Sequence, residues 1–257
     1  MSRRPAWLWG AALAAYVFLY APLVIVVAYS FNESRLNAQW TGFTFAWYQK
    51  LFQNERMLGA AWNSLIIAVV TSAVSTLLGT MAGYALYRFK TRLLPVLVLA
   101  PIAIPEILMG VSLLIFFVML NLTLGMVSII LSHIAFCIGF VAIVVRSRLS
   151  GMDESLTEAA RDLGATPWQA FRLVTLPLIM PGVIAGALMA FTLSIDDFVI
   201  TFFTAGVGSS TLPLQIYTMV KIAVTPEVNA VSTLLMLLTL VLIMIAMKLS
   251  PDALKGR

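Results

Sequence analysis

Six long apolar stretches constrain this chain more than any other feature of its sequence. They cover residues 7–29, 63–87, 94–120, 125–146, 179–203 and 228–248. A helix needs roughly 20 mainly apolar residues to cross a bilayer, and each stretch is about that long. The chain is also only 11% charged, whereas a soluble domain carries about a quarter of charged residues. The sequence therefore predicts an all-α membrane protein with six transmembrane helices, forming a single domain over residues 1–257.

Lysines and arginines beside these stretches predict the orientation of the helices, because such residues gather on the cytoplasmic side. With the N-terminus inside, twelve of them fall on the inner side and four on the outer side. The inner set is Arg3, Arg4, Arg88, Lys90, Arg92, Arg146, Arg148, Arg161, Arg172, Lys248, Lys255 and Arg257. The outer set is Arg35, Lys50, Arg56 and Lys221. Both termini are therefore expected in the cytoplasm, and the net charge of +5 needs no nucleic acid to explain it.

The N-terminal segment resembles a secretory signal peptide at its start. Its apolar run continues to Tyr29, however, which is too long for a signal-peptide core. We expect an uncleaved first helix. The single cysteine, Cys137, excludes an internal disulfide.

Two outer segments, residues 30–62 and 205–227, are long enough to carry a function. The first is rich in aromatic residues, namely Trp40, Phe43, Phe45, Trp47, Tyr48 and Phe52. One interpretation is an aromatic belt at the membrane surface, where tryptophan and tyrosine are enriched. The other is a surface that docks an external partner, and the sequence leaves both open.

The loop over residues 147–178 is the one sizeable polar segment on the inner side, and it predicts two short helices with a hinge. Ser155 and Glu158 fit a capping box for the first helix. Gly164 follows its last apolar residue, where a helix often ends in the left-handed conformation. Thr166, Pro167 and Gln169 fit the start of the second helix. We expect that helix to end before Pro177.

The first helix of this loop carries a low apolar face, because Leu156, Ala159, Ala160 and Leu163 recur at helical spacing. Its polar face mixes acidic and basic residues, namely Glu158, Arg161 and Asp162. An amphipathic helix on an anionic membrane is instead rich in lysine and arginine. The pattern favours docking to a protein over lying on the membrane.

Three acidic residues fall inside the apolar stretches, where ionisable groups are costly and usually functional. They are Glu106, Asp196 and Asp197. On a continuous helix, Asp197 would share a polar stripe with Ser194, Thr201 and Thr204, whereas Asp196 would join a more apolar row. Asp197 is therefore the first candidate for an acid that lines a transport path, with Thr201 beside it. Hydrogen bonding of its carboxyl group between helices is an equal alternative.

Glu106 follows two prolines, Pro101 and Pro105, which should break or kink the third stretch. Such breaks survive at membrane depth where the backbone is packed in protein or lines a cavity, so Glu106 is a further candidate for the path. His133 and Cys137 share one helix face, but two residues are too few for a metal site. We expect His133 to bond a neighbouring helix.

The inner loop resembles the EAA loop of bacterial ATP-binding-cassette (ABC) importer permeases. The resemblance rests on Glu158-Ala159-Ala160, Gly164 and Leu176-Pro177 at the family spacing, with Val174 where isoleucine is usual. It implies a type I importer fold in the bacterial inner membrane, in which this loop forms coupling helices against an ATPase. The coupling residues would be Glu158, Ala159, Ala160, Gly164, Leu176 and Pro177.

The same resemblance implies partners for the chain. They are a second permease subunit, two copies of an ABC ATPase that binds the ATP and Mg, and an extracytoplasmic substrate-binding protein. The chain itself would hold no cofactor and catalyse no reaction. It carries no glycine-rich Lys-Ser/Thr loop of the phosphate-binding kind.

Finer resemblance narrows the substrate to polyamines. Residues 191–200 (FTLSIDDFVI), 211–221 (TLPLQIYTMVK), 226–233 (PEVNAVST) and 30–32 (SFN) are similar to spermidine and putrescine permeases, in particular to the second permease subunit of such systems.

Two rival functions remain. An ion-gradient-driven secondary transporter or channel for a small cation would use Glu106 and Asp197 as coupling sites. It predicts inverted repeats, which the sequence lacks, and leaves the inner loop unexplained. An intramembrane enzyme has only His133 with Ser132 as a candidate pair.

Overall fold

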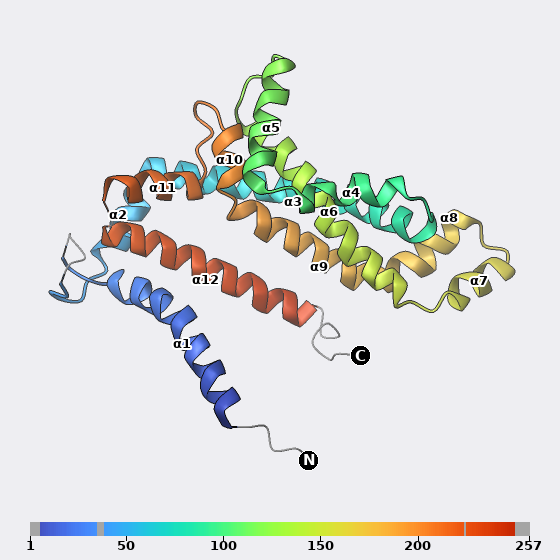
Figure 1. The fold of residues 1–257 in the computed structure, drawn as a ribbon, viewed down its shortest axis with the longest axis horizontal. Coiled ribbons are helices and arrows are strands. Elements are labelled where there is room, and N and C mark those ends of the chain that lie inside the picture. Colours follow the sequence, from blue (N-terminus) through green and yellow to red (C-terminus); the bar gives the residue numbers. More distant parts are fainter. Residues whose placement is uncertain (1–5, 35–38, 224, 250–257) are drawn as a thin grey trace. The chain divides into compact units, whose positions relative to one another are not determined.

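A computed structural model describes residues 6–34, 39–223 and 225–249, and these residues are helical with short connections (Figure 1). The one β-bridge among them pairs Asn32 with Phe43. The chain divides into two compact units, residues 1–58 with 215–239 and residues 59–214 with 240–257. Some of the basic residues that predict the orientation of the helices lie outside the described residues, namely Arg3, Arg4, Arg35, Lys255 and Arg257.

Four helical runs among the described residues are long and apolar enough to cross a membrane. They are α1 (Ala6–Tyr29), α3 (Glu55–Arg88), α6 (Met126–Ser150) and the run Pro167–Ile195, which ends with α9 (Leu176–Ile195). The pair α4 (Leu93–Ala103) and α5 (Glu106–Met119) makes a fifth if it counts as one span. The all-α membrane class is confirmed. The sixth stretch corresponds to α12 (Pro226–Leu249), whose described apolar part is shorter.

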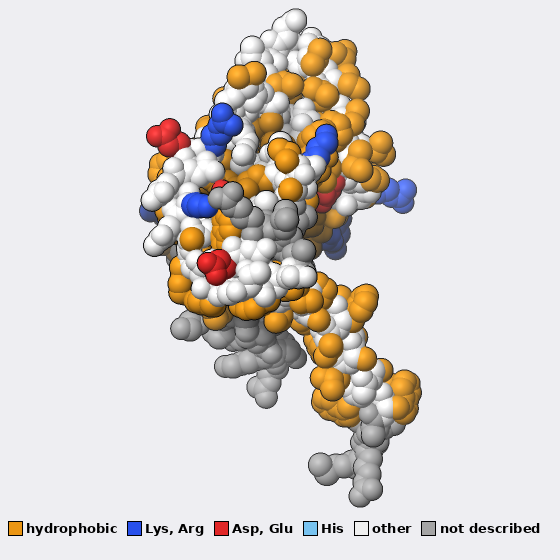
Figure 2. Space-filling view, turned by 90° about the vertical axis from the view of Figure 1, so that its left-hand side faces the viewer, with side chains coloured by type: hydrophobic (Ala, Val, Ile, Leu, Met, Phe, Trp, Pro, Cys, Tyr) orange, Lys and Arg blue, Asp and Glu red, His pale blue; other side chains and the backbone are white. Residues whose placement is uncertain are grey.

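The outside of these helices is apolar over wide areas. Hydrophobic side chains cover much of the face shown in Figure 2. On α1, Trp7 and Phe18 are 69% and 79% exposed. An exposed apolar surface of this kind indicates contact with lipid or with another subunit.

In the unit that holds α1, the first outer segment is organised around one buried side chain, that of Asn32. Its amide donates to the carbonyl of Gln39 at 2.8 Å and accepts from the N–H of Thr41 at 3.1 Å. Its own carbonyl accepts from the indole of Trp47, at the start of α2 (Ala46–Gln53). The neighbouring Phe31 stacks on Phe43 at 5.1 Å between ring centres. The SFN motif therefore folds the aromatic segment back on itself.

In the other unit, α6 forms the centre of the core. It packs against α4, α9 and α10 (Val199–Thr204), and α10 packs against α5. Gly186 lets α9 approach closely, since a Cβ atom there would lie 3.0 Å from Val141. The buried core consists of Met109, Phe136, Cys137, Val141, Val145, Leu149, Ile179, Ala190 and Ile200.

Two of the apolar stretches are interrupted in the structure, the third as predicted from its prolines and the fifth unexpectedly. Between α4 and α5 the chain bends by 106°. Ile104 there is extended before Pro105, because proline disfavours a helical residue before it. The fifth stretch ends as a helix at Ile195 and resumes as α10, so its continuous helix over 179–203 is a wrong prediction. The carboxylate of Asp197 accepts the backbone N–H of Thr201 in the first turn of α10, which stabilises a new helix start.

Candidate functional site

The predicted hinge at Gly164 is confirmed as a turn between two short helices. The first is α7 (Ser155–Asp162) and the second is α8 (Pro167–Ala170). Gly164 has φ of +91°, a conformation that glycine adopts at little cost. Its N–H bonds the carbonyl of Arg161, and the N–H of Ala165 bonds that of Ala160. These two bonds form a Schellman motif, so α7 ends in a defined geometry.

The two predicted capping boxes have opposite outcomes. At α8 the box is confirmed, with Thr166 accepting from the N–H of Gln169 and the Gln169 side chain accepting from the N–H of Thr166. At α7 the prediction for Ser155 is wrong, because the helix already includes this residue and Asp153 accepts its N–H at 3.0 Å. Hydrogen bonds from the Ser155 side chain and backbone lower the pKa of Asp153.

The predicted end of the second helix before Pro177 is also wrong. Helix α8 runs into a π-helical turn, η1 (Phe171–Thr175), and on into α9 without a break. Pro177 is the second residue of α9, directly after η1. π-Turns inside helices occur often at functional sites. The loop therefore continues without a break into the helix that ends at Ile195.

The surface of α7 and α8 is exposed and partly apolar. Leu163 is 90% exposed and Trp168 is 67% exposed, while Ala159 and Glu158 are exposed beside them. An open hollow between the two helices is lined by Glu158, Arg161, Asp162, Gly164, Ala165 and Pro167. The exposed leucine and tryptophan next to this hollow fit a protein-docking surface.

The contacts that join this loop to α3 were not predicted from the sequence. Tyr87 donates its phenol hydrogen bond to Glu154, which precedes α7. One turn earlier the ring of Tyr84 meets that of Phe171, the first residue of η1, at 5.1 Å between ring centres. Two tyrosines three residues apart at the end of an apolar stretch were the available signal, although such residues are usual at membrane surfaces.

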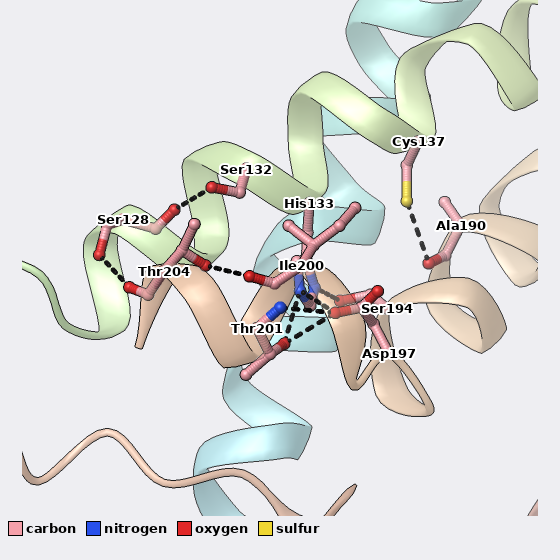
Figure 3. A network of polar contacts seen from close by, with 10 residues as sticks. All are labelled: Ser128, Ser132, His133, Cys137, Ala190, Ser194, Asp197, Ile200, Thr201 and Thr204. Atoms are coloured by element: carbon pink, nitrogen blue, oxygen red, sulfur yellow. Dashed lines mark hydrogen bonds and ion pairs between the residues drawn. The ribbon is translucent and has the colours of Figure 1, made fainter. Parts of the chain in front are cut away.

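His133 on α6 lies at the centre of a buried polar network (Figure 3). Its Nδ1 atom is 2.8 Å from the hydroxyl of Ser194, and its Nε2 atom is 2.9 Å from that of Thr201. The same Nε2 atom is 3.2 Å from the carboxylate of Asp197. The expectation that His133 bonds a neighbouring helix is confirmed. Leaving one member of such a buried hydrogen-bonded network without its partner costs about 1–3 kcal/mol.

Two further bonds hold α6 to the same strip of chain on either side of His133. The hydroxyl of Ser128 donates to the carbonyl of Thr204 at 2.7 Å, and the thiol of Cys137 donates to that of Ala190 at 3.7 Å. The chain on both sides of the break between α9 and α10 is thus hydrogen-bonded to α6 (Figure 3).

The two neighbouring acids differ in exposure. The side chain of Asp197 is only 6% exposed and lies in helix-to-helix bonding, the alternative that the sequence left open. Thr201 is buried beside it. Asp196, in the break itself, is exposed, as is Glu106 at the start of α5. Helices α5 and α10 pack against one another, and each follows a break that presents one exposed carboxylate.

Comparison with known proteins decides the family. The model of the family described as "Binding-protein-dependent transport system inner membrane component" matches residues 75–256. The chain belongs to this family. A member of the family is the non-catalytic membrane subunit of an ABC transporter in the inner membrane, and its ATP is bound by a partner ATPase. An ATPase and a binding protein are thus partners of this family member.

Curated family members are similar to the chain over most of its length. The spermidine/putrescine transport system permease protein PotC of Escherichia coli (strain K12) is 43% identical over 96% of this chain and 95% of its own. The putrescine transport system permease protein PotI of the same organism is 42% identical over 87% of this chain and 83% of its own. PotC of Haemophilus influenzae is 39% identical, over 90% and 91%.

Solved ABC importers share the fold. A crystal structure of a bacterial ABC transporter that imports the acidic polysaccharide alginate matches with a TM-score of 0.73 and 17% identity, over 96% of this chain and 98% of that one. The MetNI methionine ABC transporter matches with a TM-score of 0.65 and 24% identity, over 77% and 98%. The predicted resemblance to ABC importer permeases is confirmed, which removes the gradient-driven transporter and the intramembrane enzyme as rivals.

Proposed function

We propose that this chain is the permease subunit of an ABC importer for putrescine and spermidine. The observation that carries the proposal is its 43% identity, over 96% of its length, to a spermidine/putrescine permease. Both substrates are flexible chains with ammonium groups. A path for them needs accessible acids and apolar walls rather than a fixed pocket for a rigid ligand.

The substrate path is proposed to pass the two breaks. Discontinuous helices at membrane depth often line transport sites, and the C-terminal end of a half-helix favours a cation. Asp196 stands at the C-terminal end of α9, and Glu106 follows the bend between α4 and α5. Their carboxylates would bind an ammonium group as it passes. Asp197 and Thr201, proposed for the path from sequence, would act from within the buried network.

Coupling to the ATPase is proposed at the loop over residues 147–178. Glu158, Ala159, Ala160 and Gly164 lie on or beside the exposed face of α7. Leu176 and Pro177 begin α9, so a push on the loop would move α9 and, at its far end, Asp196. This connection provides a route for alternating access.

The rest of the assembly is proposed from the family pattern. The chain would form one permease domain with six spans and both termini in the cytoplasm. It would pair with a second permease subunit and with two ATPase copies.

An uptake assay in cells without their own polyamine transport tests this function. The cells express the chain with its second permease, ATPase and binding protein, and the control cells lack only this chain. We expect uptake of labelled putrescine or spermidine above the control, and no uptake of labelled lysine. Assembly of the full complex without uptake of either polyamine would contradict the proposal.

A further inference from the structure

The break between α9 and α10 is surrounded by more hydrogen bonding than a helix end requires. Ser194 lies before it, Asp197 within it and Thr201 after it, and all three contact His133. Each comes from the interrupted stretch, whereas His133 comes from α6. One side chain therefore ties both sides of the break, and the acid inside it, to a second helix (Figure 3).

The proton positions in this network follow from the donors available. Thr201 has one hydroxyl proton, and it goes to Asp197 at 2.9 Å. Its oxygen must therefore accept from Nε2–H of His133. The same proton also faces Asp197, and Nδ1 pairs with Ser194. Every polar side chain in the network has a partner, a condition that makes a buried polar cluster rigid.

Asp196 shares none of these bonds, although it is the residue next to Asp197. It is exposed while Asp197 is buried. In a continuous helix the two side chains would differ by about 100° around the axis, and the stretch would have no reason to end at Ile195. The two neighbouring acids therefore lie in different surroundings, with the side chain of Asp197 inside the network and Asp196 outside it.

We propose that His133 and Asp197 are positioning residues, whose buried contact keeps the break between α9 and α10 and so presents Asp196 to the transport path. The pair does not bind the substrate itself. This inference rests on the proposed path at Asp196. It adds two residues that would control the affinity for substrate through the geometry of the break.

Uptake kinetics in proteoliposomes that hold the complete transporter provide the first test. His133→Leu should raise the KM for labelled putrescine by about tenfold or more. This factor corresponds to the free energy of one charge-assisted hydrogen bond. His133→Gln, which keeps a donor near the Nε2 position, should restore the KM toward the parent value. Phe136→Leu, a buried change one turn away on α6, is the matched control and should leave the KM unchanged.

A labelling experiment tests the geometry without any substrate. Since Cys137 is buried and is the single cysteine, a Cys137→Ala background with Asp196→Cys carries one reporter thiol. We expect a charged thiol reagent to label it several times more slowly when His133→Leu is added, and at the parent rate when Phe136→Leu is added. Thr201→Val provides a milder variant if His133→Leu does not assemble.

The two readouts separate the inference from the proposed function. Unchanged labelling in both His133→Leu and Thr201→Val would overturn the positioning role, whatever the substrate. An equal loss of maximal rate in His133→Leu and Phe136→Leu, with KM unchanged, would overturn it as well. Failure of putrescine uptake in the parent transporter, with slowed labelling in His133→Leu, would count against the proposed function and for the positioning role.

Discussion

The phenol of Tyr87, at the end of α3, donates a hydrogen bond to the carboxylate of Glu154, the residue that precedes α7. One turn back on α3, Tyr84 packs against Phe171, where the loop becomes η1. Helix α3 therefore contacts the proposed coupling loop at two places, just before α7 and at the start of η1. A push on α7 and α8 would reach α3 as well as α9.

Removing the Tyr87 hydroxyl should loosen this connection. We expect Tyr87→Phe to cost about 1 kcal/mol, because the bond is to a charged group but lies near solvent. The complex should assemble, and fewer substrate molecules should be transported per ATP hydrolysed. The measurement is the ratio of uptake to ATPase rate in proteoliposomes.

Tyr84→Phe is the control for that variant, since it removes a hydroxyl one turn away and keeps the ring contact with Phe171. An unchanged ratio in Tyr87→Phe would show that the bond carries no coupling.

Gly164 should tolerate few replacements, for conformational rather than steric reasons. A Cβ atom there would meet nothing within 4 Å, but φ is +91°. A β-branched residue in this conformation costs about 1–3 kcal/mol. We expect Gly164→Val to weaken binding of the ATPase in a pull-down and to lower uptake, while membrane insertion stays intact.

Gly151→Val offers a matched comparison in the same loop, because Gly151 has φ of −95° and a Cβ atom there would make only ordinary contacts, the nearest at 3.7 Å to the carbonyl of Arg148. If both variants retained full ATPase binding and uptake, Gly164 would not act as a hinge.

Asn32 should be essential for the shape of the first outer segment. Asn32→Ala removes three side-chain bonds from a buried site, two of them at 2.8 and 3.1 Å, and should cost about 1–3 kcal/mol. Limited proteolysis within residues 33–45 should then be faster. Asn54→Ala, whose bonds of 3.3 and 3.4 Å are longer, should have a smaller effect, and equal rates in the two variants would argue against this role.

Much of the helical layout follows from apolar length alone. The first stretch was predicted over 7–29 and α1 covers Ala6–Tyr29, and the fourth was predicted over 125–146 and α6 covers Met126–Ser150. The turn at Gly164 and the cap at Thr166 were also predictable, because both depend on local hydrogen bonds.

The break at Asp196 was not predictable from local sequence. No proline or glycine marks residues 196–198, so periodicity favours a continuous helix there. The hydrogen bonds around the break come from Thr201 and from His133, which lies more than sixty residues earlier in the chain. The sequence ranked Asp197 ahead of Asp196 as a path-lining acid because it does not show hydrogen bonds between helices. Those bonds bury the side chain of Asp197.

The proposed substrate path depends on the passage of a polyamine along the carboxylates of Glu106 and Asp196. Initial rates of labelled putrescine uptake against concentration, in proteoliposomes with the full transporter, test it most directly. Glu106→Gln and Asp196→Asn should each raise the KM, and the double variant should raise it by about 100-fold or more, as expected for two lost charge interactions. An unchanged KM in the double variant, with normal uptake, would contradict the claim.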